Sequence, residues 1–394
     1  MLPAYYDFHS PVKILSGINA LENLPSELAG LAVSRPLVIT DKGATKAGLI
    51  KVFKKAFSDS GMTLGAIVDD VPAPASCRAV TDIARVFRTN RCDGIIAVGG
   101  RSVINTAKGV AILVSNGSDD ILAFAGTRML VKPLVPVVVV PTASGSGAEV
   151  TSTVVIDDTD LNTSMSCTSG YLVPVMALLD PRMIIAQPGI DTAAAGMHAL
   201  ANAMDATMSV RRNPMSDAFA FAAIDLIRLN LIKALQDKGS PGVRLALANA
   251  SVMAGTAFSN ATGGVVHALS QSIGCAARIP WGVALAIILP LGLEYNLHTC
   301  EATLASLLLP LAGADEYARI PEARRALRLI ECVRELQKTL KDLTGLPLTL
   351  KDAGVPEHML ETIAQMAVND PSVLLNPRDM TVPQAMDLLN RAYA

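Results

Sequence analysis

Short, continuously apolar segments alternate with helix-like segments through about the first 185 residues of this chain. The apolar segments are PLVIT (36–40), TLGAIVDD (63–70), DGIIAVGG (93–100) and LVPVVVVPT (134–142). They lack the polar alternation of a strand that has one face in water, and the segments between them have helical periodicity. The pattern predicts an α/β domain whose parallel sheet is covered by helices on both faces. Such a sheet binds ligands at the carboxyl ends of its strands.

The pattern changes after residue 187, where nearly every segment has helical periodicity. Clear examples are 217–237, 241–260, 322–343 and 383–394. Because a single hydrophobic core stops growing at roughly 250–300 residues, a chain of 394 residues is expected to form two domains. We therefore predict an α/β N-terminal domain over 1–187 and an all-helical C-terminal domain over 188–394, with a cleft between them.

Composition and charge exclude several classes of partner. The net charge of −2 gives no electrostatic reason to bind nucleic acid or an anionic membrane. The longest apolar stretch, residues 281–297, contains Pro290 and Glu294 and falls short of the roughly 18 residues of a membrane helix. The six cysteines include no CxxC pair, and the N-terminus has no basic region followed by an apolar run. These features predict a cytoplasmic protein with reduced thiols.

Two glycine-rich segments follow predicted strands. The first, VGGRSVINTAK (98–108), has glycines where a phosphate could approach the backbone, a following helix with free N–H groups, and the hydroxyl of Ser102. The second, PTASGSGAEVT (141–151), is rich in glycines and small hydroxyl residues. Either segment alone could be a tight strand-to-helix turn, but the two together favour a bound nucleotide.

Asp41 directly follows the apolar segment 36–40. An acidic residue at this point can accept hydrogen bonds from an adenine ribose, which favours NAD over the 2′-phosphorylated cofactor. The alternative is that Asp41 caps the following helix.

The stretch GMHALANAMDA (196–206) places His198 and Asn202 four residues apart, on one face of a predicted helix. Farther along, GGVVHALSQSIG (263–274) places His267 four residues before Gln271. Histidine is a good ligand for divalent metals and asparagine is a poor one. These helices could form a metal site or a former metal site, or the histidines could be hydrogen-bonded core residues.

In their order along the chain, these segments resemble the iron-containing (group III) alcohol dehydrogenases, which also include glycerol dehydrogenases and maleylacetate reductases. The resemblance runs the whole length, from SPVKILSGINAL (10–21) to NPRDMTVPQAMDLLNRAY (376–393). It implies a dehydroquinate synthase-like fold, in which a dinucleotide-binding domain is followed by a helical, metal-holding domain. It also implies a homodimer or higher homo-oligomer, since family members commonly pair their N-terminal strands.

The resemblance implies that NAD(H) is the cofactor. Asp41 stands at the position of the family's ribose-binding aspartate, and other residues match the family's GGGSxxDxAK and PTTAGTGSE segments. The expected cofactor-binding residues are Asp41, Gly99, Gly100, Ser102, Lys108, Thr142 and Ser146. Four positions depart from those patterns: Arg101 replaces the third glycine, Asn105 replaces the aspartate, and Ala143 and Ser146 each replace a threonine. The Arg101 side chain could block the approach of the pyrophosphate, clamp it, or point to solvent.

The metal site departs further from the family. An aspartate and three histidines usually hold the metal, and the corresponding positions here are His198, Asn202, His267 and Trp281. Only His267 is unchanged, and an indole has no lone pair to donate. We therefore expect the affinity for Fe²⁺ or Zn²⁺ to fall by several orders of magnitude. Water or an external carboxylate could still complete a site on His198 and His267.

Three functions are compatible with these residues. The first is an oxidoreductase without the usual metal, as in the maleylacetate reductase branch. There NADH would supply hydride to a small aldehyde or keto compound, and His198 or His267 would supply the proton. The second is a catalytically impaired paralogue that acts as a binding or assembly subunit. The third is a nucleotide-binding protein with non-redox chemistry.

Overall fold

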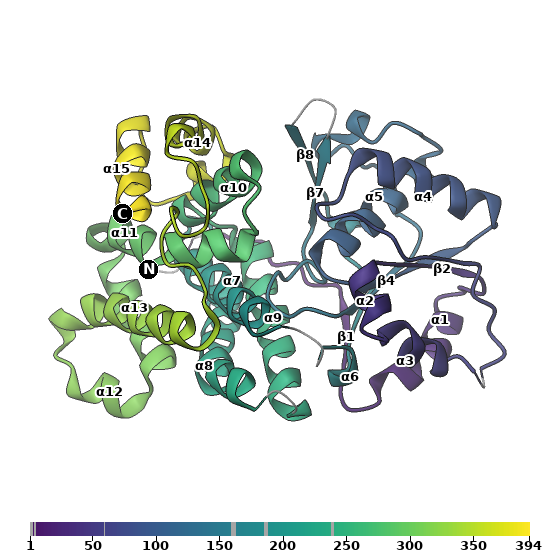
Figure 1. Ribbon diagram of the computed structural model, residues 1–394, viewed down its shortest axis with the longest axis horizontal. Helices are drawn as coiled ribbons and strands as arrows, with labels where there is room; N and C mark the ends of the chain where they lie inside the picture. Colours follow the sequence, from purple (N-terminus) through teal and green to yellow (C-terminus); the bar gives the residue numbers. More distant parts are fainter. Residues whose placement is uncertain (1–2, 4, 59, 159–162, 185–187, 238–239) are drawn as a thin grey trace. The chain divides into compact units, whose positions relative to one another are not determined.

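The computed structural model describes residues 3, 5–58, 60–158, 163–184, 188–237 and 240–394 (Figure 1). Two compact units are present. The α/β unit comprises His9–Ser144 and Ala148–Gln187, and the helical unit comprises Pro188–Ala394 with Met1–Phe8 and Gly145–Gly147. The fold class predicted from the sequence is confirmed. The division differs in two respects from a simple break after residue 187, because Met1–Phe8 and the short segment Gly145–Gly147 belong to the helical unit.

A six-stranded parallel sheet forms the centre of the α/β unit, in the order β1-β9-β6-β4-β2-β3. The strands are β1 Lys13–Ser16, β2 Pro36–Thr40, β3 Ala66–Val68, β4 Gly94–Gly99, β6 Val137–Pro141 and β9 Met176–Leu179. In the register of the sheet, Thr40 pairs with Val98, and Gly99 pairs with Pro141. The segments that follow β2, β4 and β6 therefore leave the sheet at the same edge.

Helices cover both faces of this sheet, which explains why its strands are apolar without alternation. Figure 1 shows α4 (Cys77–Thr89) and α5 (Arg101–Asn116) on one side of β2 and β4. On the other side lie α1 (Leu24–Gly30) and α3 (Leu49–Lys55). Two short helices, α2 and α6, span Lys42–Lys46 and Pro181–Ile184. Leu37 and Ile39 of β2 pack in the core that contains α4 and α5, and Val38 between them packs in the core that contains α1 and α3.

A second, small sheet was not predicted from the sequence. It consists of β5 (Gly126–Thr127), β8 (Thr163–Thr168) and β7 (Thr153–Asp158), and β7 and β8 pair antiparallel. Only Val154 and Ile156 of β7 are fully apolar and buried, in the same core as α5. This strand thus has one covered face, and two buried residues were too short a signal to recognise.

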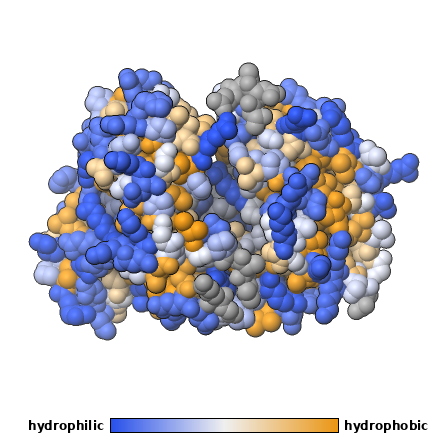
Figure 2. Space-filling model, viewed as in Figure 1, coloured by the Kyte–Doolittle hydropathy of each residue, from blue (hydrophilic) through white to orange (hydrophobic). Residues whose placement is uncertain are grey.

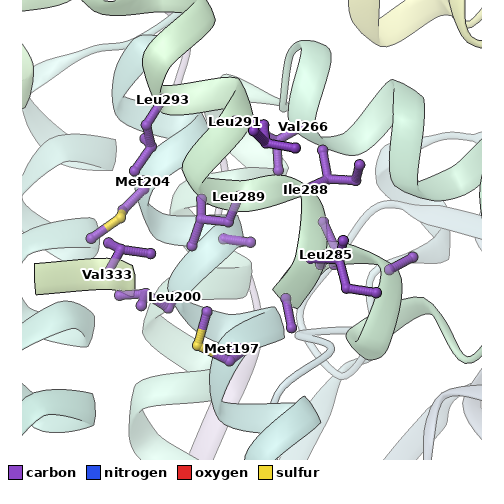
Figure 3. Close-up of a cluster of buried hydrophobic side chains, with 14 of the residues drawn as sticks. Met197, Leu200, Met204, Val266, Leu285, Ile288, Leu289, Leu291, Leu293 and Val333 are labelled. Carbon is purple, nitrogen blue, oxygen red and sulfur yellow. The ribbon is translucent and has the colours of Figure 1, made fainter. Parts of the chain in front are cut away.

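The helical unit contains the helices α7 Gly189–Met208, α8 Pro214–Gln236, α9 Pro241–Ala261, α10 Val265–Ala277, α11 Trp281–Ala312, α12 Ala314–Arg319, α13 Arg325–Thr344, α14 Leu360–Val368 and α15 Val382–Tyr393. Its core forms around α7 and α11. Figure 3 shows Met197, Leu200 and Met204 of α7 in a cluster of buried side chains from α10, α11 and α13. Helix α7 is therefore a fixed central element, and its polar residues are held in a tightly packed interior.

Helix α11 is longer than the apolar stretch 281–297 noted in the sequence. It includes Pro290 and Glu294 and runs over 32 residues, with non-helical backbone angles at Cys300. By length and composition it could cross a membrane, but 78% of its most apolar window is buried inside the protein. This is the burial of a core helix. In the view of Figure 2, hydrophilic residues cover much of the visible surface, with hydrophobic residues between them.

Candidate functional site

A pocket of about 430 Å³ lies beside the ends of β2 and β4 in the α/β unit. It is lined by Asp41, Lys42, Gly43, Val71, Pro72, Ala73, Gly100, Arg101, Ser102 and Val103. The structure thus brings Asp41, Gly100 and Ser102 together, as expected for residues at neighbouring strand ends. A second hollow, of about 490 Å³, lies beside α4 and contains none of the expected site residues.

The two glycines of the turn after β4 have different roles. A Cβ atom on Gly99 would lie 2.5 Å from a methyl group of Val103, so the tight packing of the turn requires glycine there. A Cβ atom on Gly100 would make only an ordinary contact, 3.7 Å from Ala143. Gly100 is the N-cap of α5 and has no side chain to cap the first N–H groups of that helix. The positive end of the α5 dipole therefore faces the pocket uncapped.

Asp41 caps α2: its Oδ1 accepts a hydrogen bond of 2.8 Å from the backbone N–H of Ala44. The structure therefore shows the helix cap that was the alternative to a ribose contact. It does not exclude the ribose contact, because a carboxylate has two oxygens and Asp41 also lines the pocket. The role of Asp41 in cofactor binding stays a prediction.

Arg101 is the first residue of α5 and is one of the residues that line the pocket. The residue is only partly exposed, and burial lowers the pKa of its guanidinium to about 9, with the carboxylate of Asp157 acting in the opposite direction. The alternative in which Arg101 points to solvent is therefore wrong. Blocking or clamping a cofactor are the two alternatives that agree with its position.

Lys108 lies farther along the same helix and does not line the pocket. Its Nζ donates to the carbonyl oxygens of Thr151 (2.7 Å) and Thr153 (3.2 Å) and to the Thr151 hydroxyl (3.3 Å). One turn nearer the pocket, Asn105 Nδ2 donates to the Val155 carbonyl at 3.0 Å. The N–H groups of Lys108 are directed at β7 and the residues before it. Lys108 therefore joins α5 to β7 and to the residues before it, and its role in cofactor binding stays a prediction.

The segment after β6 connects the two units. The Thr142 N–H donates to the Gly99 carbonyl at 3.2 Å, which fixes Thr142 beside the turn after β4. Ser146, by contrast, belongs to the helical unit. A Cβ atom on Gly145 would overlap the carbonyl of Ala195 in α7. A Cβ atom on Gly147, which has a φ of +67°, would lie 2.5 Å from the Cα of Gly255 in α9. Packing against helices, rather than approach of a phosphate, explains these two glycines.

In the helical unit, three of the polar residues from α7 and α10 form a buried hydrogen-bonded chain. Nδ1 of His267 lies 2.6 Å from Asp205 Oδ2, and Nε2 lies 2.8 Å from Asn202 Oδ1. The Nδ2 of Asn202 donates to the Ser146 carbonyl at 3.3 Å. Both ring nitrogens of His267 are therefore engaged with protein oxygens.

Asp205 was not singled out from the sequence. It lies three residues after Asn202 and seven after His198, so it shares their face of α7, and this spacing was the available signal. Its Oδ2 also accepts from the backbone N–H groups of Gly264 (2.7 Å) and His267 (3.3 Å). Asp205 therefore fixes both the start of α10 and the orientation of the His267 ring.

Aromatic rings enclose the two histidines. Trp281 contacts both imidazoles, with ring centroids 5.3 Å from His198 and 6.0 Å from His267. The ring of Phe258 also packs against the imidazole of His267, with 4.3 Å between the two ring centroids. The indole therefore occupies space beside both imidazoles.

Comparison with known proteins agrees with the family resemblance of the motifs. Residues 11–181 match the iron-containing alcohol dehydrogenase domain, and residues 192–393 match the C-terminal domain of the Fe-containing alcohol dehydrogenase family. The chain belongs to the iron-containing alcohol dehydrogenase family. The resemblance seen in the sequence is confirmed.

Its curated relatives are alcohol and diol dehydrogenases. Long-chain-alcohol dehydrogenase 1 of Geobacillus thermodenitrificans is 35% identical over 91% of this chain and 89% of its own length. The NAD-dependent methanol dehydrogenase of Bacillus methanolicus is 29% identical over 98% of this chain and 99% of its own. The crystal structure of a 1,3-propanediol oxidoreductase superposes with a TM-score of 0.93 at 31% identity, covering 99% of this chain and 100% of that one.

Proposed function

We propose that the protein is an NAD(H)-dependent oxidoreductase that transfers hydride between the nicotinamide and a small alcohol, aldehyde or keto compound. One observation carries this proposal: the pocket at the ends of β2 and β4 combines an acidic residue, an uncapped helix N-terminus and a hydroxyl, in a chain of this family. The NAD dependence named for the Bacillus methanolicus relative supports the same cofactor.

The residues of the pocket fit a dinucleotide. Asp41 would bind the adenine ribose, and Gly99, Gly100, Ser102 and Thr142 would leave room and donors for the pyrophosphate. When bound, NADH supplies the hydride. We propose that Arg101 clamps the pyrophosphate, because the residue lines the pocket, is partly buried, and would gain an anionic partner for its guanidinium there. Ser146 is a further proposed contact.

Asp41→Ser separates the two roles of this residue. Serine is also a good N-cap, so the stability of the protein should be nearly unchanged. The loss of a charged hydrogen bond to the ribose should weaken NADH binding by about 10-fold or more. Fluorescence titration with NADH measures this, and equal affinities for the two proteins would show that Asp41 only caps the helix.

We further propose that the family's metal site is degraded in this chain. A metal on His267 needs the Nε2 lone pair, but this nitrogen lies against Asn202 Oδ1. Trp281 offers no lone pair. Within the described residues, no group of three or more His, Cys, Asp or Glu side chains is placed to hold a metal ion. The residues present therefore do not fit the metal.

His198 and His267 are the proposed sources of the proton that the substrate oxygen gains during carbonyl reduction. His267 is bound through both nitrogens, so it can donate to a substrate only if Asn202 is displaced. His198 is buried against Trp281, one helical turn before Asn202. These contacts favour His198 as the proton donor and give His267 a positioning role.

Three measurements on protein purified without chelators test this function. They are NADH titration, metal analysis, and turnover of a panel of aldehydes and keto acids with and without Fe²⁺. We expect NADH binding, metal well below one ion per chain, and turnover that Fe²⁺ does not raise. Failure to bind millimolar NADH would exclude a dehydrogenase of this kind.

A catalytically impaired subunit is the second candidate, and the occupied Nε2 of His267 is the observation that favours it. It predicts NADH binding without turnover of any compound in the panel. A homo-oligomer and a cytoplasmic location stay predictions from the sequence.

A further inference from the structure

Five of the 13 lysines of the chain lie within residues 42–55, a segment that contains no aspartate or glutamate. We call these residues the lysine cluster: Lys42 and Lys46 of α2, and Lys51, Lys54 and Lys55 of α3. All five are exposed. Of the lysines that the structure describes, only Lys13 and Lys341 form ion pairs. The positive charges of the cluster are therefore not neutralised by neighbouring carboxylates.

The lysine cluster extends from the rim of the cofactor pocket along the surface of the α/β unit. Lys42 is one of the residues that line the pocket. Helices α2 and α3 contact each other and are separated in the chain by two residues (Figure 1). Helix α3 buries Ile50 and Phe53, and its three lysines, spaced by three and four residues, lie on the solvent side.

Helix stability explains only part of the lysine cluster. Lys46, Lys54 and Lys55 lie in the last turns of their helices, where the dipole favours a cation. Lys42 and Lys51 lie in the first turns, where the dipole disfavours a cation. Like charges three and four residues apart also repel each other. The cluster as a whole therefore needs an explanation other than the stability of these two short helices.

The charge balance near the pocket is opposite to that of the whole protein. The chain has a net charge of −2, which repels an anion at long range. Asp41 lines the pocket, and Asp69 and Asp70 directly precede Val71 of its wall. Against these three carboxylates stand the five lysines and Arg101. A dinucleotide carries a negative charge on each phosphate, so it is attracted to this side of the α/β unit.

We propose that the lysine cluster is an electrostatic guide, which attracts the anionic dinucleotide and speeds its association with the pocket. This inference rests on the proposed function. The pocket lining includes Lys42 but not the other four lysines, so those four act on the approaching cofactor rather than on the bound one. Their effect should fall on the association rate constant, kon, and not on the dissociation rate constant, koff.

Stopped-flow fluorescence of NADH binding to the full chain, at several NaCl concentrations, tests the proposal. The test variant carries Lys51→Gln, Lys54→Gln and Lys55→Gln, which lie on a helix outside the pocket lining. The control variant carries Arg78→Gln, Arg85→Gln and Arg91→Gln. These exposed arginines lie on α4 or just after it, and α4 covers the other face of the sheet (Figure 1). Both variants change the net charge equally, and surface substitutions of this kind should leave both proteins folded.

At about 10 mM salt we expect kon of the test variant to be about 3- to 10-fold below that of the wild-type protein. The control should stay within about 2-fold of the wild type, and koff should be the same in all three proteins. At about 1 M NaCl, where the Debye length is about 3 Å, the three values of kon should converge.

Three results would overturn the proposal while leaving the proposed function intact. They are an unchanged kon in the test variant at low salt, an equal fall of kon in the control, and an effect confined to koff. The first would leave the lysines to another partner, such as an acidic protein. The second would assign the effect to net charge, and the third to contact with the bound cofactor. A wild-type protein that does not bind NADH at all would overturn the proposed function and this inference together.

Discussion

Gly147→Ala tests whether the 145–147 segment is fixed by its packing on the helical unit. Gly147 has a φ of +67°, and its N–H donates to the Ser251 hydroxyl of α9 at 3.4 Å. A methyl group there would lie 2.5 Å from the Cα of Gly255, which is backbone and cannot turn aside. Either the segment or α9 must therefore move.

Two free-energy costs determine how far Gly147→Ala should destabilise the helical unit. A left-handed backbone conformation costs a non-glycine residue about 1–2 kcal/mol. Inserting a methyl group against packed backbone costs about 1–3 kcal/mol more. The free energy of unfolding of the helical unit should therefore fall by about 2–5 kcal/mol. With an m-value of about 2–3 kcal/mol per M, the urea midpoint should fall by about 1–2 M.

Trp281 makes the assay specific, because it is the single tryptophan of the chain and lies in the helical unit. Its fluorescence during urea unfolding reports on that unit. Gly242→Ala is the matched control, since Gly242 lies in α9 and a methyl group there meets no atom within 4 Å. The control should leave the midpoint unchanged or raise it slightly. An unchanged midpoint in Gly147→Ala would refute the reasoning.

Three further predictions concern charge and ligands. Burial lowers the pKa of Lys108 to about 7, below that of the unfolded chain. Between pH 7 and 9 the unfolded chain therefore holds more protons, and the free energy of unfolding should rise with pH by up to about 1.4 kcal/mol per unit. Urea denaturation should show a flatter pH dependence for Lys108→Met, and equal slopes would contradict the shift. Arg101→Gly should weaken NADH and ADP-ribose binding by about 10-fold or more but leave adenosine binding unchanged, whereas tighter binding would identify Arg101 as an obstruction. Replacing His198, Asn202 and Trp281 together by the family's usual ligands (Asp, His and His) should raise the metal content to about one ion per chain, measured by elemental analysis. If the triple variant folds but binds no metal, the replacement of these three ligands does not by itself explain the loss of the metal site.

Much of the fold could be predicted from local sequence. The segment 36–40 is apolar at every position because β2 is buried on both faces, and the predicted strand matches Pro36–Thr40. The helical part was recognised from its periodicity, which depends only on neighbouring residues. The β7–β8 hairpin was missed because its covered face contributes so few apolar residues.

The positions of Asp41, Gly100, Arg101 and Ser102 also followed from the sequence. In a parallel sheet the ends of adjacent strands lie at one edge, so local strand assignments already place these residues together. Their shared pocket needed no knowledge of distant contacts.

The tertiary structure decided the rest. Lys108 matches a family motif, yet the structure directs its Nζ to carbonyls 43 and 45 residues away. Gly145 and Gly147 belong to a segment typical of phosphate binding, yet helices α7 and α9 explain them.

The sequence by itself determined that α7 presents His198 and Asn202 on one face, because helical spacing is a local property. Only the tertiary structure decided what meets that face. His267 reaches Asn202 and Asp205 across 65 and 62 residues of chain, and Asn202 reaches Ser146 across 56. Hydrogen-bond direction depends on which donors and acceptors come within about 3 Å, and only the packing of distant segments sets that.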